Sequence, residues 1–212
     1  MVLHVDVISD VICPWCYIGK RRLEKAIAAI EGQHKVRVRW LPFQLNPQMP
    51  KEGISRREYR VAKFGNLESS LELDAKVVVA GETEGIHFAF ERIERTPNTL
   101  EAHRLIWLAD KEGVQDTVVE ALFRAYFTEG RDISNRQVLI DVVAEAGLDW
   151  RKAEAVLDSD DEVEAIKEAN EQARRFRVEG VPFFIINGKL TLSGAQQPDT
   201  FLTAFRQALA ST

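Results

Sequence analysis

The stretch Cys13-Pro14-Trp15-Cys16 contains the only two cysteines of the 212-residue chain, and two residues separate them. It follows residues 3–9, a short segment rich in β-branched side chains that predicts a buried strand. After it, apolar residues recur at intervals of three and four up to Ile30, which predicts a helix. A Cys-x-x-Cys pair placed where a strand leads into a helix is typical of a redox-active dithiol.

This placement predicts different chemistry for the two cysteines. Cys13 is expected at the helix N-terminus, where unpaired backbone N–H groups and the helix dipole stabilise a negative charge. In such a position the pKa of a cysteine falls from about 8.5 to roughly 3.5–7.5, so Cys13 is predicted to be the attacking thiolate. Its attack on a substrate disulfide would form a mixed disulfide, and Cys16, one turn further on, is predicted to resolve it. Pro14 suits the first helical turn, and Trp15 is expected to shape access to the sulfur atoms.

Other uses of a Cys-x-x-Cys pair agree less well with the sequence. A structural zinc site needs four ligands, usually with a second Cys or His pair at similar spacing, and the chain has no such pair. A purely structural disulfide across two residues would remove little chain entropy. Two unrelated buried cysteines would leave Pro14 unexplained. No metal site is therefore predicted, and the histidines occur singly, as His4, His34, His87 and His103.

The composition is that of a globular enzyme, with 45% hydrophobic and 29% charged residues. The formal net charge of −5 argues against nucleic acid as a partner, because phosphate binding needs a concentrated basic surface. The short basic run at residues 20–22 is expected to form a solvated helix face. No stretch reaches the roughly 20 apolar residues needed to cross a bilayer, so no membrane partner is expected. The first residues lack a basic segment followed by an apolar one, and we expect a cytoplasmic protein.

The N-terminal part predicts a β-α-β unit, in which the second strand covers residues 36–40 and parallel pairing is the default. From residue 46 to residue 171 the pattern is helical. Three helix starts are predicted there from a capping residue followed three positions later by an acid or an amide. These are Asn98 with Glu101, Ser134 with Gln137, and Ser159 with Glu162.

Strand signals return near the C-terminus. Two short apolar strands, residues 183–186 and 190–192, are joined by the hairpin turn Asn187-Gly188, and a helix follows over residues 198–210. A lone hairpin is marginal in water, so these strands are expected to complete the N-terminal sheet. We therefore predict an α/β protein of two domains: a discontinuous domain of residues 1–45 and 172–212, and an inserted helical domain of residues 46–171.

Four motifs span nearly the whole chain: SDVICPWC (residues 9–16) with Gly19, NTLEAHR (98–104), EGVPFF (179–184) and LSGAQ (192–196). Together they resemble the DsbA family of thiol–disulfide oxidoreductases, and within it most closely the FrnE-type subgroup of cytoplasmic DsbA-like proteins. The resemblance implies a thioredoxin-like fold with a large all-α insertion.

The resemblance also implies a role for Val181 and Pro182. In thioredoxin-like proteins the proline before the third strand is cis and faces the active-site cysteines, and the residue before it offers its backbone to an extended substrate. We therefore expect a cis bond between Val181 and Pro182 and assign both residues to substrate binding. The alternative is a proline that only starts an edge strand.

His103 has two interpretations. It lies in one of the family-like motifs, so it could face the active site and lower the pKa of Cys13 as an imidazolium. It also lies four residues before Trp107 on one predicted helix, where the two side chains could simply pack together.

The sequence thus favours a thiol–disulfide oxidoreductase or disulfide isomerase that exchanges with protein or small-molecule thiols and disulfides. The exchange needs no cofactor, and glutathione is a candidate redox partner. In a reducing cytoplasm the dithiol would act as a reductase or isomerase rather than as a net oxidase.

Two other functions stay open. Glutathione-dependent enzymes of the kappa-class transferase or hydroxychromene-carboxylate isomerase type resemble this architecture, but they have a serine where Cys13 stands and lack the second cysteine. The other alternative is a non-catalytic thioredoxin-fold chaperone that holds extended peptides beside Pro182.

Overall fold

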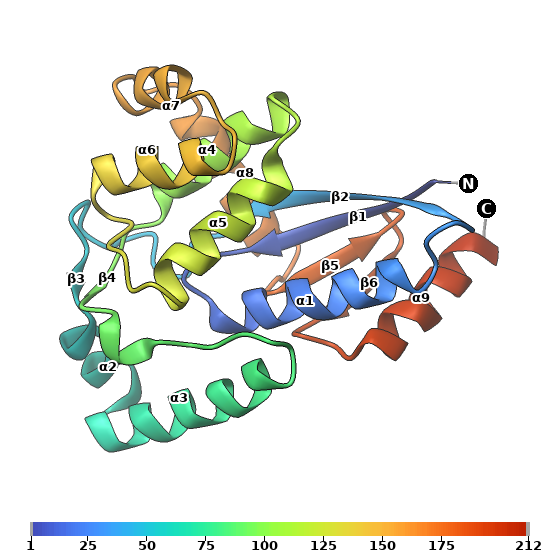
Figure 1. Ribbon diagram of the computed structural model, residues 1–212, viewed down its shortest axis with the longest axis horizontal. Coiled ribbons are helices and arrows are strands. Elements are labelled where there is room, and N and C mark those ends of the chain that lie inside the picture. The colour runs from blue at the N-terminus through green and yellow to red at the C-terminus, as the bar shows by residue number, and fades with distance from the viewer. Residues whose placement is uncertain (1, 211–212) are drawn as a thin grey trace.

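The computed structural model describes residues 2–210, and a four-stranded mixed sheet forms its centre (Figure 1). The first two strands pair in parallel with Val5 opposite Val38, as the β-α-β pattern predicted. The C-terminal hairpin pairs antiparallel with the other edge of the first strand, and Val5 lies opposite Ile186. The hairpin thus completes the sheet, as expected. The sheet order is β2-β1-β5-β6, with β1 at Val2–Ser9, β2 at Lys35–Pro42, β5 at Phe183–Ile186 and β6 at Leu190–Ser193.

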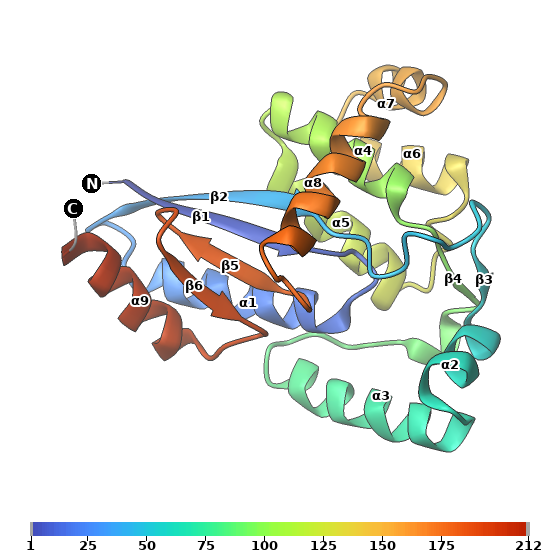
Figure 2. The ribbon, with the colours of Figure 1, turned by 180° about the vertical axis from the view of Figure 1, so that it is seen from behind.

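Helices pack on both faces of this sheet. α1 (Pro14–Ala28) and α9 (Pro198–Ala210) lie side by side along one face (Figure 1). α8 (Val163–Arg175) packs on the opposite face, where Ala173 joins a small apolar cluster with Ile8 of β1. Figure 2 shows this second face, with α8 near the end of β1 that leads into α1. The architecture is the predicted mixed α/β thioredoxin-like fold, and it places the start of α1 at one end of the sheet.

The chain between β2 and β5 forms the predicted helical insertion, apart from one short antiparallel ladder in which Ile54 lies opposite Thr96. The predicted domain boundary at residue 171 lies within α8, and the division into two domains stays a prediction. No helix in residues 2–210 is long and apolar enough to cross a membrane. The remaining elements are β3 (Ile54–Ser55), α2 (Arg56–Phe64), α3 (Leu67–Glu82), the 3-10 turn η1 (Phe90–Arg92), β4 (Arg95–Thr96), α4 (Leu100–Lys111), α5 (Gln115–Phe127), α6 (Arg136–Glu145) and α7 (Trp150–Leu157).

At α4 the capping position is Thr99, but it is the predicted Asn98 whose side chain accepts a hydrogen bond from the N–H of Leu100, at 2.9 Å. The other two predicted helix starts are displaced, and the cap of α6 is Asn135 rather than Ser134. α8 starts four residues after Ser159, whose hydroxyl accepts a hydrogen bond in the turn before the helix. Asn and Ser cap helices about equally well, so the adjacent residues Ser134 and Asn135 cannot be ranked as caps of α6 from sequence.

Residues 20–22 do not form the solvated face that we expected from sequence. The Lys20 side chain is only 2% exposed and pairs with Asp116 at 3.1 Å and Glu120 at 3.3 Å, both on α5. Arg22 is also buried and pairs with Glu84 at 2.6 Å. The basic run therefore connects α1 to the insertion through ion pairs whose acidic partners lie far away in sequence.

Hydrogen bonds from Arg104 of α4 connect this helix to the end of α7 and the turn between α7 and α8. Its side chain is almost fully buried. The guanidinium donates to the carbonyl oxygens of Asp161 at 2.9 Å, Ser159 at 2.6 Å and Val156, and to the carboxylate of Glu101 at 2.6 Å. One buried cation thus fixes the position of α4 relative to the chain that leads into α8.

We expect Arg104→Met to lower the free energy of unfolding by about 3 kcal/mol, because three carbonyl groups around a buried side chain lose their donor. Urea denaturation followed by circular dichroism measures the change. Lys111→Met on the same helix removes a half-exposed cation that pairs with Glu162, and should cost about 0.5 kcal/mol or less. Equal losses in the two variants would contradict this role of Arg104.

Candidate active site

Cys13 occupies the capping position of α1, directly after the turn that ends β1. Its backbone N–H donates to the carbonyl of Asp10 at 3.0 Å, which closes this turn. Pro14 follows at the start of the helix, where its missing N–H removes no helical hydrogen bond. The N–H of Cys16 donates to the carbonyl of Cys13 at 3.0 Å, and the backbone N–H groups of Cys16 and Trp15 lower the pKa of Cys13.

The two thiols are free, and they interact with each other. Donation by the Cys16 thiol lowers the pKa of Cys13 below its usual value and outweighs burial, which acts in the opposite direction. Burial, reinforced by the neighbouring Cys13 sulfur, raises the pKa of Cys16 well above its usual value. Cys13 is therefore the more acidic thiol of the pair, and Cys16 keeps its proton.

The loop before β5 lies against the start of α1. The peptide bond between Val181 and Pro182 is cis, as the resemblance implied. Cys13 Sγ lies 3.4 Å from the carbonyl oxygen of Val181 and donates to it when protonated. A Cβ atom on Gly19 would lie only 2.9 Å from Cγ of Pro182, so α1 approaches this loop closely because residue 19 has no side chain. Within residues 2–210 the N–H of Val181 donates to no other group and is available to an extended chain.

A cleft of about 370 Å³ lies beside Cys13. Cys13, Pro14, Trp15 and Val181 line it together with residues of α2 and α3. Cys13 is 6% exposed and Cys16 is 0% exposed, so a substrate in the cleft reaches the first sulfur only. Trp15 is 40% exposed and can contact such a substrate. The structure thus gathers the site residues predicted from sequence, with Cys16 buried next to Cys13 and Pro182 packed against α1.

A buried acid–base pair lies near the dithiol. Asp10 and His103 are both buried, and His103 Nε2 lies 3.4 Å from Asp10 Oδ1. Within the described chain neither of these two atoms has a hydrogen-bond partner of good geometry. The other carboxylate oxygen of Asp10 accepts from the N–H of Leu45 at 2.8 Å.

The side chain of His103 contacts Asp10 and does not line the open cleft. The Asp10 carboxylate acts on the Cys13 sulfur: it raises the pKa of Cys13, against the larger lowering by Cys16. Asp10 belongs to the SDVICPWC motif, but no role was predicted for it from the sequence. A carboxylate three residues before a nucleophilic cysteine was the available signal.

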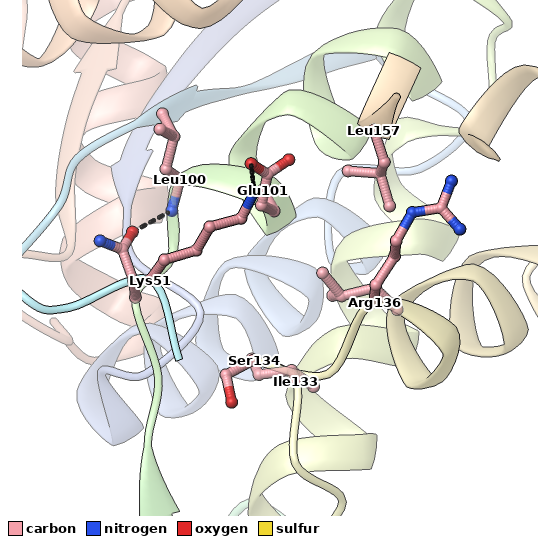
Figure 3. A pocket seen from close by; sticks show the side chains of 9 residues that line it. Lys51, Leu100, Glu101, Ile133, Ser134, Arg136 and Leu157 are labelled. Atoms are coloured by element: carbon pink, nitrogen blue, oxygen red, sulfur yellow. Dashed lines mark hydrogen bonds and ion pairs between the residues drawn. The ribbon is translucent and has the colours of Figure 1, made fainter. Parts of the chain in front are cut away.

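A second cavity of about 160 Å³ lies between α4, α6 and α7 (Figure 3). Its charged groups are paired, Arg136 with Asp158 at 2.5 Å and Lys51 with Glu101 at 4.0 Å. It contains neither cysteine, so it offers no reactive thiol. Within residues 2–210, no group of three or more His, Cys, Asp or Glu side chains is arranged to hold a metal ion. The cleft beside Cys13 is therefore the candidate active site.

Comparison with known proteins gives consistent results. The family model described as DSBA-like thioredoxin domain matches residues 4–206. The uncharacterized protein YwbO of Bacillus subtilis is 28% identical over 209 residues, which cover 95% of this chain and 94% of YwbO.

Solved structures extend the comparison. A probable DsbA oxidoreductase from Streptomyces coelicolor superposes with a TM-score of 0.88 at 28% identity, over 99% of this chain and 91% of the other. A 2-hydroxychromene-2-carboxylate isomerase superposes with a TM-score of 0.73 over 100% of this chain and 97% of the other. Because that isomerase is only 18% identical, it shares the fold and carries no argument about activity.

We expect brief treatment of the reduced protein with iodoacetamide at neutral pH to alkylate Cys13 before Cys16. Cys13 is the more acidic and the more exposed thiol, and only the thiolate reacts. Peptide mass spectrometry identifies the labelled residue, and unfolded protein, in which both thiols react alike, is the control. Earlier labelling of Cys16, or equal labelling of both in the folded protein, would show that the thiols are assigned in the wrong order.

We also expect Asp10→Asn to move the pH midpoint of Cys13 alkylation downward. The Asp10 carboxylate raises the pKa of Cys13, so removal of its charge lowers that pKa further, while Asn can still accept from Leu45. Asp6→Asn removes the same charge from β1, where Asp6 pairs with Arg39, and should leave the midpoint unchanged. An upward shift, or the same shift in both variants, would argue against a direct effect of Asp10.

Proposed function

Because this chain belongs to the DSBA-like thioredoxin domain family, we propose that it is a thiol–disulfide oxidoreductase that works through Cys13 and Cys16. The observation that carries the proposal is the contrast between the two thiols at the start of α1. The pKa of Cys13 is lowered by the Cys16 thiol, and the pKa of Cys16 is raised by burial. This is the arrangement that ordered attack and resolution require.

In the first step the Cys13 thiolate attacks one sulfur of a substrate disulfide. A Cys13–substrate disulfide forms, the substrate S–S bond breaks, and the second substrate sulfur leaves as a thiolate that takes up a proton. Cys16 then loses its proton and attacks Cys13 Sγ, which releases the first substrate sulfur. The protein dithiol gives up two electrons and two protons, and the substrate disulfide becomes two thiols.

Val181 and Pro182 are the proposed substrate-binding residues. Val181 lies on the loop that contains the cis bond. The carbonyl oxygen of Val181 is 3.4 Å from Cys13 Sγ, and its backbone N–H is on the same loop. An extended substrate that pairs with Val181 would therefore present its disulfide at Cys13. The Trp15 ring, exposed in the same cleft, supplies an apolar contact beside it.

We further propose that the chain is of the FrnE-like type and acts in the cytoplasm as a reductase or disulfide isomerase. Cytoplasmic thiols keep such dithiols mostly reduced, and a monothiol such as glutathione would return the oxidised protein to the dithiol form. Two monothiols give up the two electrons, and one disulfide of that thiol is released. No other cofactor enters this cycle.

The proposal predicts that Cys16→Ser traps mixed disulfides, whereas Cys13→Ser traps none. Attack needs the first thiol and release needs the second, so removal of Cys16 leaves the substrate bound to Cys13. Non-reducing gels of cell lysates that contain each variant measure the trapping, and treatment with dithiothreitol should dissolve the trapped species. Equal trapping by the two variants would contradict an ordered exchange.

The same variants distinguish the alternatives. A chaperone that only holds peptides would protect an aggregating client equally well after replacement of both cysteines. A glutathione-dependent isomerase would retain isomerase activity in Cys16→Ser, because its chemistry uses one residue at the helix start. Loss of activity in both single variants is the result that the exchange mechanism predicts.

A further inference from the structure

The cleft beside Cys13 is lined by an excess of positive charge. Four cations and one carboxylate, Asp74, are among its lining residues. We call the four cations the cationic wall; they are Arg56, Arg60 and Lys63 of α2 and Lys76 of α3. The whole chain has a formal net charge of −5, so this local excess is opposite in sign to the rest of the protein.

Asp74 neutralises only part of the cationic wall. One carboxylate oxygen is 3.0 Å from Arg56 Nη2 and the other is 2.6 Å from Arg60 Nη2, so two guanidinium groups share a single negative charge. The other contacts of Arg60 are neutral, to the hydroxyl and carbonyl oxygens of Ser70. Burial and the neighbouring Arg56 lower the pKa of Arg60, although Asp74 acts against them. These three charged groups retain a net charge of +1, and all three line the cleft.

The two lysines of the cationic wall have no acidic partner. Lys63 Nζ lies 2.7 Å from the hydroxyl of Tyr59 and over the ring of Phe64. Within the described chain no carboxylate lies within 4.0 Å of Lys63 or Lys76, and both side chains are exposed. Their ammonium groups are therefore available to an anionic ligand in the cleft.

Other buried or cavity-lining cations of the protein, on α1 and in the second cavity, do have acidic partners. Lys20 of α1 contacts three carboxylates. In the second cavity Arg136 pairs with Asp158 and Lys51 with Glu101, as Figure 3 shows for the latter pair. Unpaired positive charge next to a nucleophilic sulfur attracts negatively charged substrates and raises their rate of encounter.

We infer that the cleft selects disulfides of small-peptide size that carry carboxylate groups, which the cationic wall binds while the disulfide meets Cys13. The volume of about 370 Å³ suits a small molecule rather than a folded domain. Aromatic side chains, including Tyr59 and Phe64, also line the cleft and can cover the apolar part of such a ligand. This inference rests on the proposed exchange reaction and adds the class of its substrate.

The chemistry of the exchange is unchanged by the carboxylates. The Cys13–Cys16 dithiol gives two electrons and two protons to the acidic disulfide, which leaves as two acidic thiols, and the protein retains the Cys13–Cys16 disulfide. The carboxylates stay ionised throughout and contribute only to binding and encounter. Their effect should therefore weaken as salt screens the cationic wall.

The test compares three disulfides of different charge: glutathione disulfide, which is net negative, 2-hydroxyethyl disulfide, which is neutral, and cystamine, which is positive. Reduced protein is mixed with each, and the second-order rate constant of dithiol oxidation is measured at low and high salt. The variant Lys63→Gln/Lys76→Gln is compared with Lys51→Gln/Arg57→Gln, which removes the same charge from exposed residues outside the cleft lining.

We expect Lys63→Gln/Lys76→Gln to lower the rate constant for glutathione disulfide about fivefold at low salt, since the charge contacts of two exposed lysines are lost. The rate constant for 2-hydroxyethyl disulfide should change by less than about twofold, and that for cystamine should rise. The control variant should behave as the unchanged protein. High salt should remove most of the difference, because the screening length falls to about 3 Å at 1 M.

Two other results have distinct meanings. If the unchanged protein oxidises with all three disulfides and the cleft variant alters none of the rate constants, or lowers all three equally, the inference is wrong and the exchange reaction stands. If the unchanged protein reacts with none of the three, the proposed exchange fails, and the substrate class inferred here fails with it.

Discussion

The chemistry of this protein depends on one interaction, that between the buried Cys16 thiol and the Cys13 sulfur at the start of α1. It is the largest cause of the lowered pKa of Cys13, and together with burial, the larger cause, it raises the pKa of Cys16. It can form only because Cys13 precedes the helix and Cys16 lies one turn inside it, fully buried. Both conditions follow from the position of α1 at the end of β1.

Three other parts of the fold contribute residues to this site. β5 and the loop before it bring Val181 and Pro182 to the sulfur, and Gly19 allows the close packing. α4 places His103 against Asp10, whose charge counteracts the acidity of Cys13. α2 and α3 supply the cationic wall of the cleft that Cys13 also lines. The sheet and α1 thus position the nucleophile, and the helical insertion supplies part of the cleft beside it.

The sequence was sufficient for the sheet, the hairpin at Asn187-Gly188, the helix after the cysteines and the positions of both thiols, because these depend on local patterns. The cis bond at Pro182 came from family resemblance. Contacts between distant segments could not be predicted: Lys20 looked solvated because its partners on α5 lie about a hundred residues away. The pairing of Asp10 with His103, and the presence of the α2 cations in the cleft beside Cys13, likewise depend on how the insertion folds back.

The central claim is that the fold makes Cys13, and not Cys16, the acidic thiol. The most direct test is a pH titration of thiolate ultraviolet absorbance in the reduced protein and in Cys13→Ser. We predict one thiolate that titrates below the ordinary cysteine pKa of about 8.5 and that is absent from Cys13→Ser. Titration of both thiols at or above the ordinary value, or a low-pH step that persists in Cys13→Ser, would contradict it.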